Sequence, residues 1–495
     1  MKRPENITYR LKQNVKLCIL LGAGALMTCF SIGEANARCT SGKTCPIYEN
    51  TDTALSGSIR KQIILNEKHL NYPASVARFY QQSGYKLFWI APDTVKMRAS
   101  EAMLMLDCVM QYGLNPPDYH PRELLYEKLN ELTRHFGKVS DMEKAGFDVI
   151  LTDAMLTFIN NLHFGKLNPD CSSAKIDSGN TPGFLAETVL AKALHQKKFM
   201  ETLLSVQPKL KAYTDLQFHL HLLAGLYTGD CYEVPEGDIR KISINMERLR
   251  WIKDNDTTYI HINIPSFTLE FHQPDTIYQF KVVIGKPEAP TPTLESAIKY
   301  FTTAPEWKVP AKIFIRELLP RTRNNPDYFR NHHYNIYDNN GNYVADNAAN
   351  RAMVRRDPGN YGVRQSAGCD NSLGLIVFRF PNIYDIYLHD TPEQQLFKKE
   401  TRAYSHGCIR VEQAEKLAEL LLANDASTDK ISELKNALKK YITKSFYLKK
   451  AVPIKITYLT CGVKDGVLQT YDDLYDLDKG METGLYTADM TLPVN

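Results

Sequence analysis

The chain has 495 residues, which is long enough for two or three domains with separate hydrophobic cores. Its 60 basic and 56 acidic residues leave a formal net charge of only +4. Phosphate recognition normally needs a concentrated basic surface, so we do not expect nucleic acid to be a partner.

The N-terminal segment has the composition of an export signal. Five basic residues between positions 2 and 16 precede the apolar run LCILLGAGALMTCFSI, and the small-x-small sequence Ala35-Asn36-Ala37 follows it. The run is shorter than the ~20 apolar residues of a comfortable membrane span. We therefore expect residues 1–37 to be a cleaved signal peptide. The alternative is an uncleaved anchor, in which case the membrane would also be a partner.

Cysteine usage fits an oxidising compartment. The chain has ten cysteines, and two of them, Cys39 and Cys45, lie in a linker at 38–56 that could close into a small disulfide loop. The sequence contains no Cys-x-x-Cys or His-Glu-x-x-His motif, and the pair His332 and His333 has no further ligands at a matching spacing. We therefore expect neither a metal nor a cofactor.

Residues 57–235 carry apolar residues at helical spacing. The segment SEAMLMLDCVMQYGL runs up to Asn115-Pro116-Pro117, and KAGFDVILTDAMLTFINNLHFGKLNP also ends at a proline, a residue that stops helices. Nothing in this region gathers polar residues at a catalytic spacing. We expect an all-helical domain that serves as a scaffold.

From residue 238 onward the pattern changes to strands. YIHINI at 259–264 and YQFKVVIG at 278–285 place apolar residues at alternate positions, with a Gln-Pro-Asp turn at 273–275 between them, as in a hairpin. GLIVFRF, YDIYLHD and PIKITYL predict further strands. The fold class is therefore α+β, with a mainly-β domain over residues 238–495 after the helical one.

The strand pattern is interrupted at 316–366, a stretch rich in Asn, Asp and Tyr. A long segment without clear secondary structure inside a compact domain is often a functional lid. We predict a lid insertion here, with little apolar burial of its own.

A cysteine follows in the segment RAYSHGCIRVEQAEKLAELLL. Cys408 stands in a tight turn with Gly407, ahead of a helix whose apolar positions recur at i, i+3, i+4 and i+7. The helix dipole would stabilise a thiolate, and the backbone N–H groups of Gly407 and Cys408 could bind an oxyanion. These features indicate a nucleophile for attack on a carbonyl. The helix residues expected to be buried are Ala414, Leu417, Ala418, Leu421 and Leu422.

Two histidines are candidates for the base that activates this thiol. His406 shares the tight turn, so its ring is expected to point away from the sulfur, whereas His389 can approach from a neighbouring strand. We choose His389. Asp390 projects to the opposite face of that strand and Tyr387 to the same face, so a backbone carbonyl is the expected orienting partner.

These residues carry a resemblance to a known family. His389, fifteen intervening residues, and then Ser405-His406-Gly407-Cys408 with Arg410 resemble the signature of the L,D-transpeptidase catalytic domain, a β-rich fold whose cysteine cross-links peptidoglycan. The likeness extends to PEWKVP and NSLGLIVFRFPN. HFGKLNP and ISINMERLRWI are similar to the large Gram-negative subfamily with a scaffold domain and a lid, although too few residues separate these domains for the small peptidoglycan-binding module that large members often carry.

The resemblance implies roles for particular residues. Cys408 would be the nucleophile and His389 the general base, with the amides of Gly407 and Cys408 as oxyanion donors. The resemblance also implies a group that lines the peptide groove or supports the turn and the base: Arg410, Trp307, Tyr387, Ser405, His406 and Asn371.

The implied reaction concerns the cell wall and cell shape. In the periplasm, the cysteine would attack the carbonyl of the third residue of a tetrapeptide stem, meso-diaminopimelate, release the terminal D-alanine and pass the acyl group to an amine on a neighbouring stem. Stem peptides would be the partners, with other cell-wall synthesis enzymes as further candidates, and carbapenems would acylate the cysteine.

Three alternatives remain open at the level of sequence. Water as acceptor would make the protein an L,D-carboxypeptidase, and a lipoprotein lysine as acceptor would make it an attachment enzyme. A protein of a different class would bind the wall without catalysis. The intact pair of His389 and Cys408 argues against that last reading.

Overall fold

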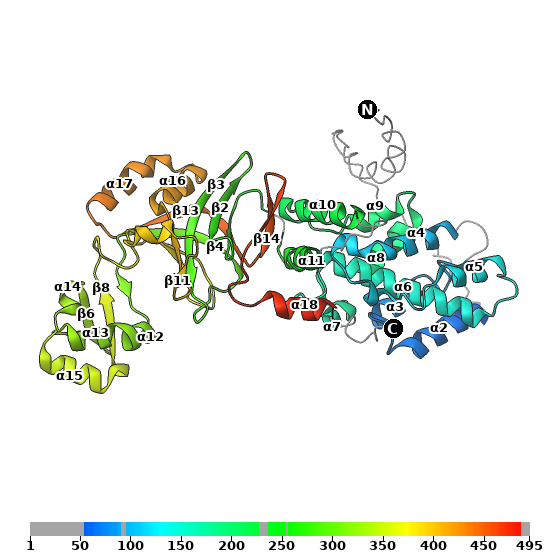
Figure 1. Ribbon diagram of the computed structural model, residues 1–495, viewed down its shortest axis with the longest axis horizontal. Helices are drawn as coiled ribbons and strands as arrows, with labels where there is room; N and C mark the ends of the chain where they lie inside the picture. The colour runs from blue at the N-terminus through cyan, green and yellow to red at the C-terminus, as the bar shows by residue number, and fades with distance from the viewer. Residues whose placement is uncertain (1–53, 91–95, 227–235, 254–255, 487–495) are drawn as a thin grey trace, which may run out of the picture. The chain divides into compact units, whose positions relative to one another are not determined.

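The computed structural model describes residues 54–90, 96–226, 236–253 and 256–486 (Figure 1). The expected signal peptide and the Cys39/Cys45 disulfide lie outside these residues, so both stay predictions. Among the helices within these ranges, none combines the length and the apolar character that a membrane crossing requires.

The first half is helical, as expected. Its central helix, α6 (Asp141–His163), is buried almost all round, as expected for a helix surrounded by others. Buried Asp148 on α6 accepts backbone hydrogen bonds from Phe88, Trp89 and Ile90 and so fixes the loop after α3. The other helices are α2 (Ala54–Asn66), α3 (Pro73–Gln82), α4 (Lys96–Asp107), α5 (Tyr126–Arg134), α7 (Ser173–Asp177), α8 (Ala186–His195), α9 (Phe199–Leu204), α10 (Lys211–Leu226) and α11 (Glu236–Arg250).

Two of these helices end before the prolines that we took as stop signals. Helix α4 ends at Asp107, and a short 3-10 turn follows it, after which Gly113 adopts φ of 66°. Helix α6 ends at His163, two residues before Gly165 with φ of 84°. Glycine accepts this left-handed conformation at little cost, so glycine terminates both segments ahead of proline.

The second half is built on a β-barrel. Eight of the nine strands of the main sheet close into a ring in the order β3-β12-β10-β9-β4-β13-β1-β2, because β2 also pairs with β3, while β11 lies beside β3. The predicted turn at 273–275 is confirmed, because Gln273 pairs with Thr276 across two residues. The predicted arms were wrong: the turn joins β3 to β2, a strand that the alternation did not reveal, and β1 pairs with β2 instead. The bounds are β1 (Tyr259–Asn263), β2 (Thr268–Gln273), β3 (Thr276–Gly285), β4 (Leu294–Thr303), β9 (Ile376–Arg379), β10 (Leu388–His389), β11 (Ala403–Ser405), β12 (Ile409–Val411) and β13 (Lys444–Thr457).

Two helices, α16 (Ala414–Asn424) and α17 (Ile431–Lys439), contribute to the same core as the barrel. The five residues that the helical spacing of α16 predicts to be buried are all buried. Leu434 and Leu438 of α17 join the same cluster. The period-3.6 pattern after Cys408 therefore identified the packed face of this helix correctly.

The lid prediction was wrong about local structure. Residues 307–365, the lid subdomain, form a four-stranded sheet in the order β5-β8-β6-β7 and bury an apolar cluster that includes Phe314, Phe329 and Ile336. These side chains lie far apart along a polar sequence, so no periodic run reveals them. The elements are β5 (Trp307–Lys308), α12 (Ala311–Ile313), a π-helical turn (Phe314–Leu318), α13 (Leu319–Asn324), α14 (Tyr328–Asn331), β6 (Tyr334–Asp338), β7 (Tyr343–Val344), α15 (Ala348–Arg356), a 3-10 turn (Pro358–Asn360) and β8 (Tyr361–Gln365).

The C-terminal end of the chain packs against α11. The hairpin β14 (Cys461–Lys464) and β15 (Val467–Thr470) precedes α18 (Asp478–Tyr486). Arg248 of α11 pairs with Asp478 at 2.5 Å, and Asn245 donates to Thr460 Oγ1 at 2.9 Å. These contacts connect the last scaffold helix to the segment that follows the barrel.

The separate core of the lid subdomain makes its stability separable from that of the barrel. Phe329→Ala removes a fully buried ring, so we expect this core to lose about 3–5 kcal/mol while the barrel core keeps its contacts. Limited trypsin digestion with mass spectrometry should show faster cleavage around Arg323 and Arg330. Tyr343→Ala, at an exposed position of the same subdomain, is the control and should digest like the parent. Equal loss of protection in the barrel would contradict this expectation.

Candidate active site

The turn that carries Cys408 joins β11 to β12 and is held by its own hydrogen bonds. Ser405 Oγ donates to the Cys408 carbonyl at 2.5 Å and accepts the Gly407 N–H at 3.1 Å. Gly407 has φ of 111°, and a Cβ there would lie 3.2 Å from Ile386 Cδ1. The turn therefore requires glycine at 407 for both conformation and space.

Two features expected at this turn are wrong. The Gly407 N–H is already donated to Ser405, so it is not a free oxyanion donor, whereas the Cys408 N–H has no acceptor among the described residues. Strand β12 also intervenes between Cys408 and α16, which begins only at Ala414. Because the field of a helix falls off within its first turn, α16 does not stabilise a thiolate at Cys408.

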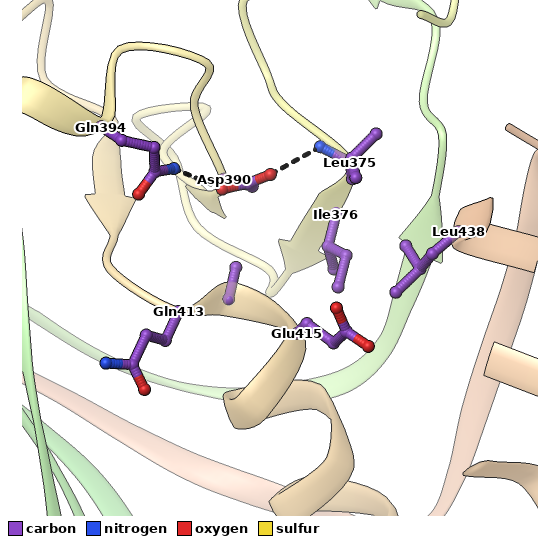
Figure 2. Close-up of a pocket in the computed structure, with 8 residues that line it drawn as sticks. Leu375, Ile376, Asp390, Gln394, Gln413, Glu415 and Leu438 are labelled. Atoms are coloured by element: carbon purple, nitrogen blue, oxygen red, sulfur yellow. Dashed lines mark hydrogen bonds between the residues drawn. The ribbon is translucent and has the colours of Figure 1, made fainter. Parts of the chain in front are cut away.

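The start of α16 faces a different pocket. Figure 2 shows Gln413 and Glu415 beside Leu375 and Asp390. The carboxylate of Asp390 accepts the Leu375 N–H at 2.8 Å there, and no described hydrogen bond joins this carboxylate to the imidazole of His389. As expected from strand alternation, the carboxylate lies away from the candidate base.

His389 sits on the strand next to the nucleophile. β10 and β12 run parallel, with Leu388 opposite Ile409 and His389 opposite Arg410, and the Ile409 N–H donates to the Tyr387 carbonyl at 3.1 Å. This register places Tyr387 beside Cys408 and His389 one step further along the same face. The Tyr387 and His389 rings lie 5.7 Å apart.

A backbone carbonyl orients the imidazole, as predicted. His389 Nδ1 lies 2.6 Å from the Asp390 carbonyl oxygen. A carbonyl can only accept, so Nδ1 carries the proton and Nε2 is left as the basic nitrogen. Burial, with the nearby charge of Arg410, lowers the pKa of His389 to about 3. The imidazole is therefore neutral at physiological pH.

The surroundings of the sulfur set its protonation state. Burial raises the pKa of the Cys408 thiol above its ordinary value, although hydrogen bonds from Tyr387 and the charge of Arg379 act in the opposite direction. The guanidinium of Arg379 lies 5.0 Å from the centroid of the Tyr387 ring. Sequence reasoning missed Arg379, because a single arginine at the end of a strand carries no motif.

Two buried donors near the thiol have no hydrogen-bond partner in the described part of the chain. They are Arg410 Nε and Trp307 Nε1. Arg410 uses another nitrogen in its ion pair with Glu393, so its Nε–H is available to a ligand oxygen. The Trp307 indole lies within hydrogen-bonding reach of the Tyr387 phenol and lowers its pKa against the larger effect of burial, so a ligand would share this donor with Tyr387.

Two further residues that the resemblance implied, His406 and Asn371, differ in their surroundings. His406 Nε2 lies 2.5 Å from Glu317 Oε1 in the lid subdomain, which agrees with the expectation that its ring turns away from the sulfur. Asn371 does not fit a substrate-binding role, because it is fully buried and its amide donates to the carbonyls of Pro305, Gln365 and Ser366. It fixes the loop before β9 instead.

The nucleophile turn is also held by a chain of hydrogen bonds through Thr291 and Tyr475, which sequence reasoning missed. Thr291 Oγ1 donates to the Gly407 carbonyl at 2.8 Å and accepts the Gly285 N–H at 2.9 Å. Tyr475, near the C-terminus, donates to the Gly285 carbonyl at 2.6 Å and accepts the Thr291 N–H at 3.2 Å. Residues 291 and 475 are too distant from 408 in sequence for any local signal to connect them.

Comparison with known proteins places this geometry in a family. Residues 257–432 match the model of the L,D-transpeptidase catalytic domain, and residues 74–220 match that of the scaffold domain. The chain therefore carries an L,D-transpeptidase catalytic domain. Domains of this family are cysteine transpeptidases, and Cys408 and His389 both lie inside the matched range.

A curated relative supports the same assignment. A Haemophilus influenzae protein named "Putative L,D-transpeptidase" is 34% identical over 242 residues, which are 48% of this chain and 48% of that protein. The chain thus spans about half the length of this curated relative. The L,D-transpeptidase domain falls in the half of the chain with the barrel and the nucleophile turn.

The half-buried thiol of Cys408 in this L,D-transpeptidase domain should react as an ordinary cysteine, with no lowered pKa, in the absence of substrate. Its raised pKa means that the thiolate is scarce at neutral pH and grows as pH rises. The rate of iodoacetamide alkylation of Cys408, followed by peptide mass spectrometry, should therefore keep rising into the alkaline range. The exposed Cys369 in the same digest is an internal reference. A plateau reached within the roughly pH 3.5–7.5 range of activated cysteines would contradict this expectation.

Proposed function

We propose that this protein is an exported L,D-transpeptidase that cross-links peptidoglycan stem peptides. Cys408 would attack the carbonyl of diaminopimelate, the third residue of a tetrapeptide donor, and release the terminal D-alanine. The observation that carries the proposal is the placement of a half-buried thiol beside Tyr387, with the neutral imidazole of His389 on the same face of the adjacent strand.

The two neutral groups favour general-base catalysis over a preformed ion pair. As sulfur bonds to the carbonyl carbon, the thiol proton passes to His389 Nε2, and the imidazolium then protonates the nitrogen of the departing D-alanine. An acceptor amine attacks the resulting thioester, gives its proton to His389 and restores the thiol. The Cys408 N–H is the donor available to the oxyanion.

The unpaired donors suit a substrate rich in carboxylates. Diaminopimelate and D-alanine both carry carboxylates, and a charge-assisted hydrogen bond to such a group is about twice as strong as a neutral one. Arg410 Nε and the exposed Arg379 are placed to make these bonds, and Trp307 Nε1 can donate to a peptide carbonyl. Positive charge near a neutral thiol would therefore favour an anionic donor peptide.

The proposed location is the periplasm, reached through the N-terminal signal, with peptidoglycan stem peptides as the partners and other cell-wall enzymes as further candidates. The lid subdomain is proposed to cover the donor peptide. Its contact with the nucleophile turn through Glu317 and His406 supports this role.

Mass spectrometry of muropeptides after incubation with the purified protein tests the proposal. We expect cross-linked dimers that contain a bond between two third-position residues. Trimmed tripeptides alone would indicate a carboxypeptidase, transfer to a lipoprotein lysine would indicate an attachment enzyme, and no change would indicate an inert wall-binding protein.

Variants assign the roles in the same assay. Cys408→Ser should lose essentially all dimer formation, and His389→Ala should lose at least ~100-fold, since general-base catalysis contributes about 10²–10⁴-fold. Cys369→Ser, which alters an exposed cysteine, is the matched control and should retain activity, as should His406→Ser to a large extent. An active His389→Ala beside an inactive His406→Ser would reverse the assignment of the base.

A further inference from the structure

Three metal-ligating side chains gather on the hairpin of β1 and β2, outside the site described above. His261 on β1 pairs directly with Glu270 on β2, and His272 follows two residues later on the same strand. Ile260, next to His261, and Phe271, between Glu270 and His272, are buried in the barrel core. Because side chains alternate along a strand, the three polar side chains share the outer face of the barrel.

This hairpin carries none of the residues of the candidate active site. Around the closed ring, β2 lies two strands from β12, which follows the nucleophile, and β1 lies four strands from β10, which carries His389. The cluster therefore needs an explanation separate from acyl transfer.

The donor atoms are close enough to share one ion. One ligand atom from each of His261, Glu270 and His272 lies within 4.8 Å of the other two, and His272 Nε2 is already 3.0 Å from Glu270 Oε2. Two imidazole nitrogens with one carboxylate suit Zn²⁺ and its first-row neighbours better than Mg²⁺ or Ca²⁺, which prefer oxygen.

Neighbouring groups hold the three side chains in place. His261 Nε2 lies 2.8 Å from Thr457 Oγ1 on β13, and the His272 ring stacks on Tyr259 with centroids 4.4 Å apart. Partners of this kind orient metal ligands in established sites.

Two lysines face the cluster and oppose a cation. The positive charge of Lys455 interacts with His261, and Lys455 also pairs with Asp256 at 3.2 Å. The positive charge of Lys464 on β14 interacts with Glu270. The ion pair offsets part of this positive charge. With three protein ligands and an open fourth position, we expect weaker binding than in a closed four-ligand site.

We infer that His261, Glu270 and His272 form a binding site for Zn²⁺ or a similar transition-metal ion, which clamps the β1–β2 hairpin on the outer face of the barrel.

Calorimetric titration of Zn²⁺ into the untagged, chelator-treated full chain tests the site. The Cys408→Ala background removes the thiol of the active site as a competing ligand. We expect one equivalent to bind and the thermal midpoint to rise with Zn²⁺ concentration. Glu270→Gln and His272→Gln should each weaken binding by more than the roughly 10–100-fold cost of losing an outer-shell partner.

His332→Gln, which alters an exposed histidine of the lid subdomain, is the matched control and should bind as the parent does. Circular dichroism of the metal-free variants establishes whether they fold. If one ligand variant does not fold, the other is sufficient for the test. Absence of binding in the Cys408→Ala background, or equal binding by the ligand variants, would overturn the inference.

Discussion

The parallel pairing of β10 with β12 is the constraint on which the catalytic arrangement depends. It sets His389 opposite Arg410 and brings Tyr387 beside Cys408. A slip of one residue would turn Tyr387 and His389 together to the other face of their strand, away from Cys408. On its other side, β12 pairs with β3, whose own pairing with β2 closes the barrel. The closed ring thus fixes the register that the chemistry requires.

The turn itself is anchored from elements distant in sequence. Thr291, in the loop after β3, bonds the Gly407 carbonyl, and Tyr475 bonds both Thr291 and the end of β3. Tyr475 in turn donates its backbone N–H to Tyr458 Oη at 2.8 Å, and Arg248 of the last scaffold helix lies over the Tyr458 ring. The nucleophile turn is therefore connected through bonded groups to α11.

The electrostatics differ from those of a cysteine at a helix N-terminus. Burial keeps both the thiol and the imidazole neutral, and positive charge comes from Arg379 and Arg410 rather than from a helix dipole. Such a pair is unreactive until a substrate carbonyl arrives and the proton can move during attack. Keeping the thiol protonated also slows its oxidation, because the thiolate is the form most readily oxidised.

Local patterns in the sequence predicted part of the fold. Alternation predicted β1 and β3, though not β2 between them, and helical spacing predicted the buried face of α16. The roles of His389 as base and Cys408 as nucleophile stay predictions. Part of what failed depended on the local conformation of the nucleophile turn, in which the Gly407 N–H is donated to Ser405 and β12 precedes α16. The rest depended on contacts between distant segments.

No sequence pattern indicates that the Gly407 N–H is donated within its own turn or that a strand, β12, separates Cys408 from α16. No pattern indicates the core around Phe329 either, because its residues are scattered along the chain. The same is true of Arg379, Thr291 and Tyr475, which reach the turn only through the closed barrel.

Peptide mapping after brief exposure to a carbapenem tests most directly whether these contacts make Cys408 the reactive centre. The strained acyl carbon of the drug should be opened by the Cys408 sulfur, with His389 as the base. If exposure alone decided which cysteine reacts, the drug would label the exposed Cys369 and not the buried Cys461. We predict an adduct on Cys408 only, lost in Cys408→Ala. An adduct on Cys369 in its place, or equal labelling of Cys408→Ala, would contradict the assignment.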